Sequence, residues 1–252
     1  MCGIIGILGS DDAAPRLVEG LKRLEYRGYD SAGIATLVNG SIHRRRAQGK
    51  LANLAAILED DPIVGDAGIG HTRWATHGVP NEINAHPHAT TRVAAVHNGI
   101  IENFSALRDE LVGGGRNFES ETDSEAIVHL ISAYLDEGDS PQLAVSRSLA
   151  RLEGAFSLAI IFAGEHDLMI GARRGSPLAV GWGQGEMFLG SDAIALASET
   201  NRVSYLEDGD WVELSRSGAI FHDAEDRVVE RAIKSSAASG AMVGKGNYRH
   251  FM

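Results

Sequence analysis

The chain has 252 residues, of which 44% are hydrophobic and 23% are charged. This composition is ordinary for a soluble globular protein and excludes extended disorder, and the length suits one domain with at most a short tail. The net charge of −11, from 34 acidic and 23 basic side chains, repels phosphate backbones and anionic membranes, so we expect no nucleic-acid or membrane partner.

The single cysteine, Cys2, excludes an internal disulfide and a cysteine-based zinc site, and it fits a reducing cytosol. The apolar run from Ile4 to Leu8 is interrupted by Gly6 and has no basic residue before it. It is therefore neither a signal peptide nor a membrane span. These features predict a cytoplasmic protein.

The first half of the chain predicts short strands separated by helices. The expected strands cover residues 3–9, 31–38, 41–48, 67–73 and 93–97. A helix capped by Ser10 or Asp11 follows the first strand, and a shorter helix begins near Leu51. Asn39-Gly40 joins two of the strands as a two-residue hairpin turn. The connection at residues 74–92 is long for a plain loop, which suggests a functional one.

The second half predicts two helices and then a run of strands. Residues 122–125 fit a capping box for one helix, and Ser140-Pro141 begins the next. The later strands are expected at residues 155–162, 167–173, 178–182, 186–189, 203–206 and 210–214. Consecutive strands with helices inserted in pairs predict an α+β fold, with antiparallel sheets covered by helices. Residues 234–246 are rich in Ser, Ala, Gly and Lys and predict a linker.

Cys2 follows the initiator methionine and precedes Gly3. Removal of Met1 would leave one residue with a thiol, reference pKa about 8.5, and a free α-amine, reference pKa about 7.7–8.0. Moving the proton from the thiol to the amine then costs only about 1 kcal/mol, so a nucleophile and its general base can share one residue. A lone cysteine is more often a small buried hydrophobe, so this interpretation needs companion residues.

The companions are groups that can stabilise an oxyanion and hold a free amino acid. Asn98-Gly99, just after the strand at 93–97, offers a side-chain NH₂ and a backbone N–H, although the same pair is common in hairpin turns. Arg73 can pair with the α-carboxylate of a substrate, and Asp123 can take its α-ammonium. The alternatives are a surface ion pair for Arg73 and a helix N-terminal charge for Asp123.

Together these segments resemble the glutaminase domain of the glutamine–fructose-6-phosphate aminotransferases (glucosamine-6-phosphate synthases). These are class II glutamine amidotransferases of the N-terminal nucleophile type. The matching motifs are MCGIIGI at 1–7, RLEYRGYDSAG at 23–33, HTRWATHG at 71–78, NAHPH at 84–88, VHNGIIEN at 96–103 and SETDSEAI at 120–127. MCGI alone is shared with other class II enzymes, whereas the combination is specific to this family.

The resemblance implies a four-layer αββα sandwich of two antiparallel sheets. It implies that Cys2 is the nucleophile with its own amine as base, that Asn98 and Gly99 form the oxyanion hole, and that Arg73 and Asp123 hold the two ends of glutamine.

The resemblance also implies that Trp74, Thr76 and His77 belong to a loop that closes over the substrate. Arg27 would be a positioning group near the nucleophile, and a structural ion pair is its alternative. Residues 1–233 would form the amidotransferase domain, and 234–252 a linker toward sugar-isomerase domains that this chain does not contain.

The implied reaction is hydrolysis of L-glutamine to glutamate and ammonia, without a cofactor or a metal. The ammonia would serve the conversion of fructose 6-phosphate to glucosamine 6-phosphate. Fructose 6-phosphate would be a partner only through the isomerase domains, and the full-length enzyme would be a homo-oligomer. By itself the chain is not expected to make the amino sugar.

Two other functions compete with this interpretation. A metal hydrolase is suggested by the histidines of one short region, which are His71, His77, His86, His88 and His97. The sequence has no HExxH motif, and two of these residues flank Pro87, so hydrogen bonds that order the loop explain them as well. A glutamine-binding regulatory module is the second alternative, but such a module has no need of a nucleophile at Cys2.

Overall fold

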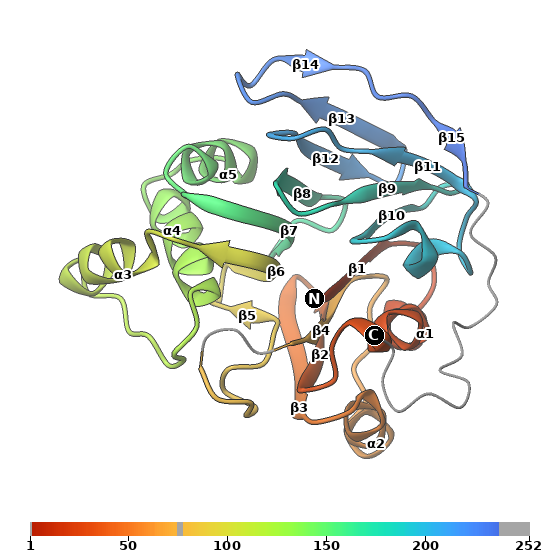
Figure 1. Ribbon diagram of the computed structural model, residues 1–252, viewed down its shortest axis with the longest axis horizontal. Coiled ribbons are helices and arrows are strands. Elements are labelled where there is room, and N and C mark those ends of the chain that lie inside the picture. Colours follow the sequence, from red (N-terminus) through yellow and green to blue (C-terminus); the bar gives the residue numbers. More distant parts are fainter. Residues whose placement is uncertain (1, 75–77, 237–252) are drawn as a thin grey trace.

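The computed structural model describes residues 2–74 and 78–236 and consists of two antiparallel sheets packed face to face (Figure 1). The larger sheet has the order β15 (Lys234–Ser235), β11 (Arg202–Tyr205), β9 (Ala179–Trp182), β10 (Met187–Gly190), β1 (Gly3–Leu8), β4 (Ala67–Arg73), β2 (Ser31–Val38) and β3 (Ser41–Gln48). The smaller sheet has the order β14 (Val228–Val229), β13 (Gly218–His222), β12 (Trp211–Ser215), β8 (Met169–Arg174), β7 (Gly154–Phe162), β6 (Val93–Ile101) and β5 (His88–Ala89).

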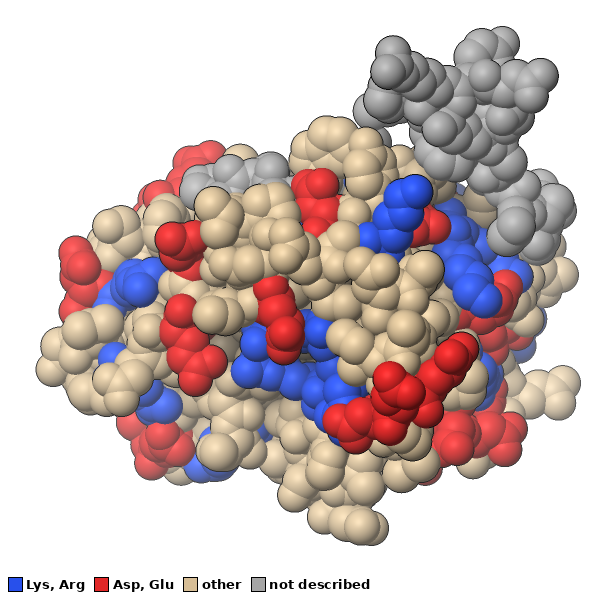
Figure 2. Space-filling model, turned by 90° about the horizontal axis from the view of Figure 1, so that it is seen from below, with Lys and Arg blue, Asp and Glu red and all other residues tan. Residues whose placement is uncertain are grey.

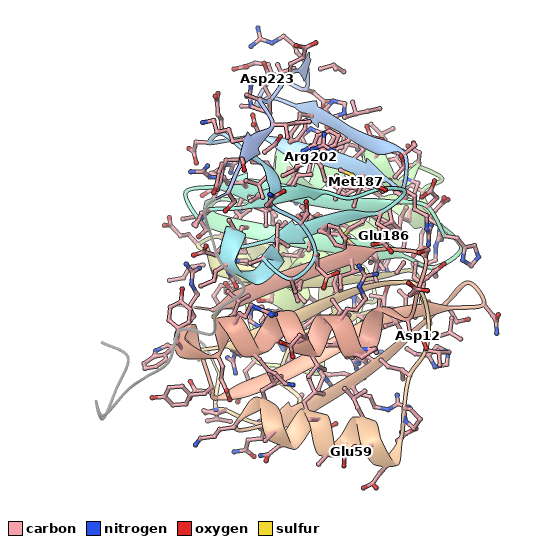
Figure 3. The ribbon with its side chains drawn as sticks, turned by 90° about the vertical axis from the view of Figure 1, so that its right-hand side faces the viewer. Asp12, Glu59, Glu186, Met187, Arg202 and Asp223 are labelled. Carbon is pink, nitrogen blue, oxygen red and sulfur yellow. The ribbon has the colours of Figure 1, made fainter. Side chains whose placement is uncertain are left out.

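Helices cover the outer face of each sheet. The larger sheet carries α1 (Ala13–Leu24) and α2 (Leu51–Asp60), and the smaller one carries α3 (Phe104–Gly113), α4 (Ser124–Asp136) and α5 (Pro141–Leu149). Two short 3₁₀ helices, η1 (Glu25–Arg27) and η2 (Ala193–Leu196), complete the described elements. In Figure 3, Asp12 marks the start of α1 and Glu59 lies near the end of α2, and both helices lie along the outside of the larger sheet.

Three buried apolar clusters separate the four layers. One lies between the larger sheet and α1 and α2, one between the two sheets, and one between the smaller sheet and α3, α4 and α5. The four-layer αββα sandwich predicted from the sequence is therefore confirmed. Burial of apolar surface in three separate layers is the main term that stabilises such a fold.

Strand alternation decides which residues face the space between the sheets. In β1, Ile4 and Leu8 belong to the cluster between the sheets, whereas Ile5 and Ile7 face α1. Ala67 and Ile69 of β4, and Ala94 and Val96 of β6, also face the layer between the sheets. Because side chains alternate with a period of two, residues 2, 71, 73 and 98 are expected on that same face.

The predicted hairpin is confirmed, because Asn39 and Gly40 have φ values of 49° and 80°, as a type I′ turn requires. Two capping predictions are wrong. The N-cap of α1 is Asp12 rather than Ser10 or Asp11, and it makes no side-chain capping bond. The capping box also does not form, because the Glu125 carboxylate accepts bonds from the backbone of residues 119 and 120.

The C-terminal strands β13, β14 and β15 were not predicted from the sequence. They carry partly exposed residues, so their apolar pattern is weak. Lys234–Ser235 pairs with β11, which extends the sheet two residues beyond the predicted start of the linker. Within the described ranges, none of the helices combines the length and apolar character needed to cross a membrane. On the face shown in Figure 2, basic side chains are bordered by acidic ones.

Candidate active site

A cavity of about 340 Å³ lies at one end of the layer between the two sheets. Its walls come from the residue before β1, from η1, the end of β4, the loop before β5, β6, the start of α4 and the β8–β9 turn. The lining residues are Cys2, Arg27, Arg73, Trp74, His86, His97, Asn98, Gly99, Ile100, Thr122, Asp123, Ser124, Ser176 and Pro177. Seven of the nine residues singled out from the sequence therefore line one cavity, and Thr76 and His77 lie outside the described residues.

Cys2 directly precedes β1, and its thiol is held against the end of β4. The backbone N–H of Trp74 donates to Sγ at 3.2 Å, and Sγ lies 3.6 Å from the Trp74 carbonyl oxygen. Burial raises the pKa of the Cys2 thiol, while the Trp74 hydrogen bond and the charge of Arg73 lower it. Gly28 packs against the same end of β4, where a Cβ would lie 2.7 Å from the Arg73 carbonyl carbon.

Asn98 and Gly99 lie within β6, not after it as predicted, because they pair with Ser157 and Phe156 of β7. The hairpin-turn alternative is thereby excluded. The Asn98 side-chain NH₂ donates to the Cys2 carbonyl oxygen at 3.2 Å. Gly99 has φ +127°, and a Cβ there would lie 2.0 Å from the carbonyl oxygen of Ala155, so only glycine fits.

Arg73 and Asp123 are both buried, and each residue exposes 4% of its surface. A surface ion pair is therefore not the role of Arg73. Burial lowers the pKa of Arg73, and the carboxylates of Asp30 and Asp123 oppose this shift. Asp123 makes no capping bond to α4; its Oδ2 instead accepts from the backbone N–H of Ile101 at 2.8 Å. This bond ties the start of α4 to the end of β6.

Arg27 lines the cavity and forms an ion pair, so the ion-pair alternative is confirmed, whereas the positioning role stays a prediction. Its Nη2 lies 2.6 Å from Oδ2 of Asp192, and its Nε donates to the Tyr26 hydroxyl. Trp74 stands at the mouth of the cavity with 44% of its surface exposed. Its ring meets Tyr29 edge to face, with 5.6 Å between the ring centroids.

Four of the histidines noted in the sequence gather at the cavity wall, where His86 and His97 line the cavity and His71 and His88 lie behind them. The ring centroid of His86 is 4.3 Å from that of His71, 4.8 Å from that of His88 and 6.4 Å from that of His97. Burial lowers the pKa of His71 and of His88 to about 3 and that of His86 well below its usual value. Among the residues that the structure describes, no group of His, Cys, Asp or Glu side chains is arranged to hold a metal ion.

Several lining residues were not predicted for this site from the sequence, although His86 and His97 were noted as possible metal ligands. His86, His97, Thr122 and Ser124 lie inside the motifs that carry the resemblance, so the motifs themselves could have identified them. Ser176 and Pro177 come from the turn between β8 and β9, where the sequence Gly-Ser-Pro indicates only a turn. Only the three-dimensional arrangement brings that turn to the cavity.

Comparison with known proteins decides the family of this site. The profile described as "Glutamine amidotransferase domain" matches residues 71–198, a little over half of the chain. The chain belongs to the glutamine amidotransferase domain family. Its fold agrees, since glutamine phosphoribosylpyrophosphate amidotransferase from B. subtilis superposes with a TM-score of 0.77 at 25% identity, covering 90% of this chain and 50% of that one.

Two curated relatives of this amidotransferase domain carry the name glutamine–fructose-6-phosphate aminotransferase (isomerizing). The protein from Brucella abortus is 62% identical and the one from Zymomonas mobilis 60% identical, each over 252 residues. The match covers 100% of this chain but 42% of each relative. The chain thus corresponds to the N-terminal part of these longer proteins.

Proposed function

We propose that this domain hydrolyses L-glutamine to L-glutamate and ammonia, with Cys2 as the nucleophile. The observation that carries the proposal is the convergence of one thiol, two hydrogen-bond donors and two opposite charges on a single cavity. Cys2, Asn98, Gly99, Arg73 and Asp123 all line it. A cavity of about 340 Å³ is of the size expected for a small ligand.

In the proposed first step, the Cys2 thiolate attacks the side-chain carbonyl carbon of glutamine and the C=O electrons move onto oxygen. The Asn98 NH₂ and the Gly99 N–H stabilise this oxyanion. An amide NH₂ carries two donors, so the Asn98 nitrogen can serve the oxyanion while it keeps its 3.2 Å bond to the Cys2 carbonyl.

Collapse of the tetrahedral intermediate expels the amide nitrogen, which takes a proton from the α-ammonium of Cys2 and leaves as ammonia. A thioester remains. Water then attacks the thioester with the amine as base, and glutamate and the free thiol are released. This base exists only when Met1 has been removed, and general-base help is worth about 10²–10⁴ in rate.

The remaining cavity residues would hold and enclose the substrate. Arg73 can form two parallel bonds to the α-carboxylate, and Asp123 can accept from the α-ammonium through the carboxylate lone pairs that the Ile101 N–H leaves available. Trp74, Thr76 and His77 would form the closing loop. Arg27 would position the nucleophile through its place on the cavity wall.

In a longer protein of the kind that the relatives represent, the ammonia would convert fructose 6-phosphate to glucosamine 6-phosphate. Fructose 6-phosphate would bind only to the isomerase domains of that protein. We propose that the amidotransferase domain, predicted as residues 1–233, extends to Ser235, where β15 ends, and that the linker follows it. We also propose a cytoplasmic, homo-oligomeric full-length enzyme whose glutaminase step needs no cofactor or metal.

The test is ammonia release from glutamine by the trimmed chain and by Cys2→Ala. We expect Cys2→Ala to lose ammonia release entirely while its thermal unfolding stays unchanged. Intact mass spectrometry with an electrophilic glutamine analogue should show one adduct, located on Cys2 and only in chains without Met1. Equal turnover by Cys2→Ala, or equal labelling of chains that retain Met1, would contradict the proposal.

A further inference from the structure

We infer that His71 is a positioning residue that fixes the orientation of the Asn98 carboxamide, so that its NH₂ rather than its oxygen faces Cys2. The inference rests on the proposed function of Asn98 as an oxyanion donor. His71 does not line the cavity and would act only through Asn98.

The contact is direct and fully buried. His71 has no exposed surface, and its Nε2 lies 3.0 Å from Oδ1 of Asn98 and 3.0 Å from the backbone carbonyl oxygen of His97. The bond joins the two sheets, since His71 is in β4 and Asn98 in β6. Strand alternation brings both side chains to the layer between the sheets, two residues beyond Ile69 and Val96.

The carbonyl of His97 determines the tautomer of His71. A backbone carbonyl can only accept a hydrogen bond, so the Nε2 that faces it must carry the proton. The same N–H also faces Asn98, which must therefore present its oxygen to His71. The Asn98 NH₂ is then directed to the opposite side, where it bonds the Cys2 carbonyl. If the amide were rotated, its NH₂ would face the His71 N–H and its oxygen would face the Cys2 carbonyl oxygen. The bonds from Asn98 to His71 and to Cys2 would both be lost.

The surroundings keep the His71 ring neutral and in place. Burial lowers its pKa to about 3, so the ring stays uncharged over the whole ordinary pH range. The ring of His86 packs against it at 4.3 Å between centroids. Gly33, paired with His71 across β2 and β4, allows this packing, because a Cβ at Gly33 would lie 2.2 Å from the His86 carbonyl oxygen.

The test compares His71→Gln with His71→Asn. Both side chains end in a carboxamide, and that of glutamine is longer by one methylene. A glutamine NH₂ can occupy the place of Nε2 and donate to both oxygens, whereas an asparagine NH₂ falls short. We expect His71→Gln to keep kcat within about threefold of the wild type. His71→Asn should lower kcat about 10²-fold, the size of effect known for loss of one oxyanion donor, with KM for glutamine changed less than threefold.

A double-mutant cycle separates positioning from general destabilisation. Because His71 acts through Asn98, His71→Asn should cause no further loss of kcat in an Asn98→Ala background. A loss of the same size in both backgrounds, equal kcat for the Gln and Asn variants, or a KM that rises as much as kcat falls would overturn the inference.

Nitrogen-15 NMR of His71 tests the inference without an activity assay. We expect the Nε2–H tautomer between pH 5 and 8 and one set of Asn98 side-chain NH₂ signals. An Nδ1–H tautomer, or Asn98 signals averaged by amide rotation, would overturn the inference. A trimmed wild-type chain that releases no ammonia would instead refute the proposed function.

Discussion

The layer between the two sheets has two regions built on the same strands. In the middle of the layer, Ile4, Ile69 and Val96 form a dry apolar core. Two residues away from each of these lie Cys2, just before β1, His71 in β4 and Asn98 in β6. Strand geometry therefore aims both sets of side chains in the same way, and only the residue types differ. The comparison shows that a packed apolar core can give way to a polar cavity over two residues of each strand.

The two regions differ in what a substitution should change. In the apolar region the side chains contribute buried area and volume, which affect stability in proportion to what is removed. In the polar region each group has one or two specific partners, so a small displacement should alter chemistry more than stability. The predictions that follow separate these two outcomes.

Gly99→Ala should produce the largest effect. At φ +127° and with Ala155 oxygen only 2.0 Å from the new Cβ, β6 must shift away from β7, which moves the Gly99 N–H. We expect kcat to fall about 10²–10³-fold, as for loss of an oxyanion donor. Gly113→Ala at the end of α3 is the control, because nothing lies within 4 Å of its Cβ. Steady-state glutaminase assays of both variants check this.

Ile69→Ala should act on stability alone. Ile69 is completely buried between the sheets, and removing such a side chain typically costs about 2–5 kcal/mol. We expect the free energy of unfolding, measured with urea, to fall by that amount while KM for glutamine is unchanged at 25 °C. A large change in KM would show that the two regions are coupled and would break the comparison.

Arg73→Lys should weaken glutamine binding without unfolding the domain. Lysine keeps the positive charge but lacks the planar fork that bonds a carboxylate twice. Loss of one charged hydrogen bond, about 1.5–3 kcal/mol, corresponds to a rise in KM of about 10–100-fold. Arg92→Lys is a matched control, since Arg92 pairs with Asp136 on the surface. Equal KM values for the two variants would show that Arg73 does not bind the α-carboxylate of glutamine.

The buried histidines should make stability fall as the pH decreases from about 6.5 toward about 3. The pKa of His71 and of His88 is lowered to about 3 and that of His86 is also lowered, so unfolding lets each ring gain a proton below about pH 6.5. Stability is therefore fully present above that pH and decreases as the pH falls, by up to about 1.4 kcal/mol per pH unit for each ring. Urea unfolding of the wild type and of His86→Phe, which should show a shallower slope, measures this.

The sequence predicts the fold well where local signals and tertiary structure agree. The Asn39-Gly40 turn, the Ser140 cap and most strands follow directly from their residue types. The capping box at residues 122–125 was wrong for a tertiary reason. Glu125 serves a neighbouring loop, and Asp123 bonds a strand 22 residues away in sequence. Local rules contain no information on such partners.

The candidate site was predictable because its residues lie in short, recognisable segments of the chain. What the sequence could not supply is their relation in space. The strand at 93–97 was predicted to end before Asn98, yet β6 continues to Ile101, because pairing with β7 holds the extended backbone through Gly99. His71 was noted only as one of several histidines, since its bond to Asn98 crosses from one sheet to the other.

The bond from Trp74 to the thiol gives this residue two functions at once. Its ring borders the entrance, and its backbone N–H supports negative charge on Sγ. A movement of the chain at this point that pulled the amide away would leave the sulfur harder to ionise. A displacement of Trp74 would therefore alter both the entrance to the cavity and the pKa of the Cys2 thiol.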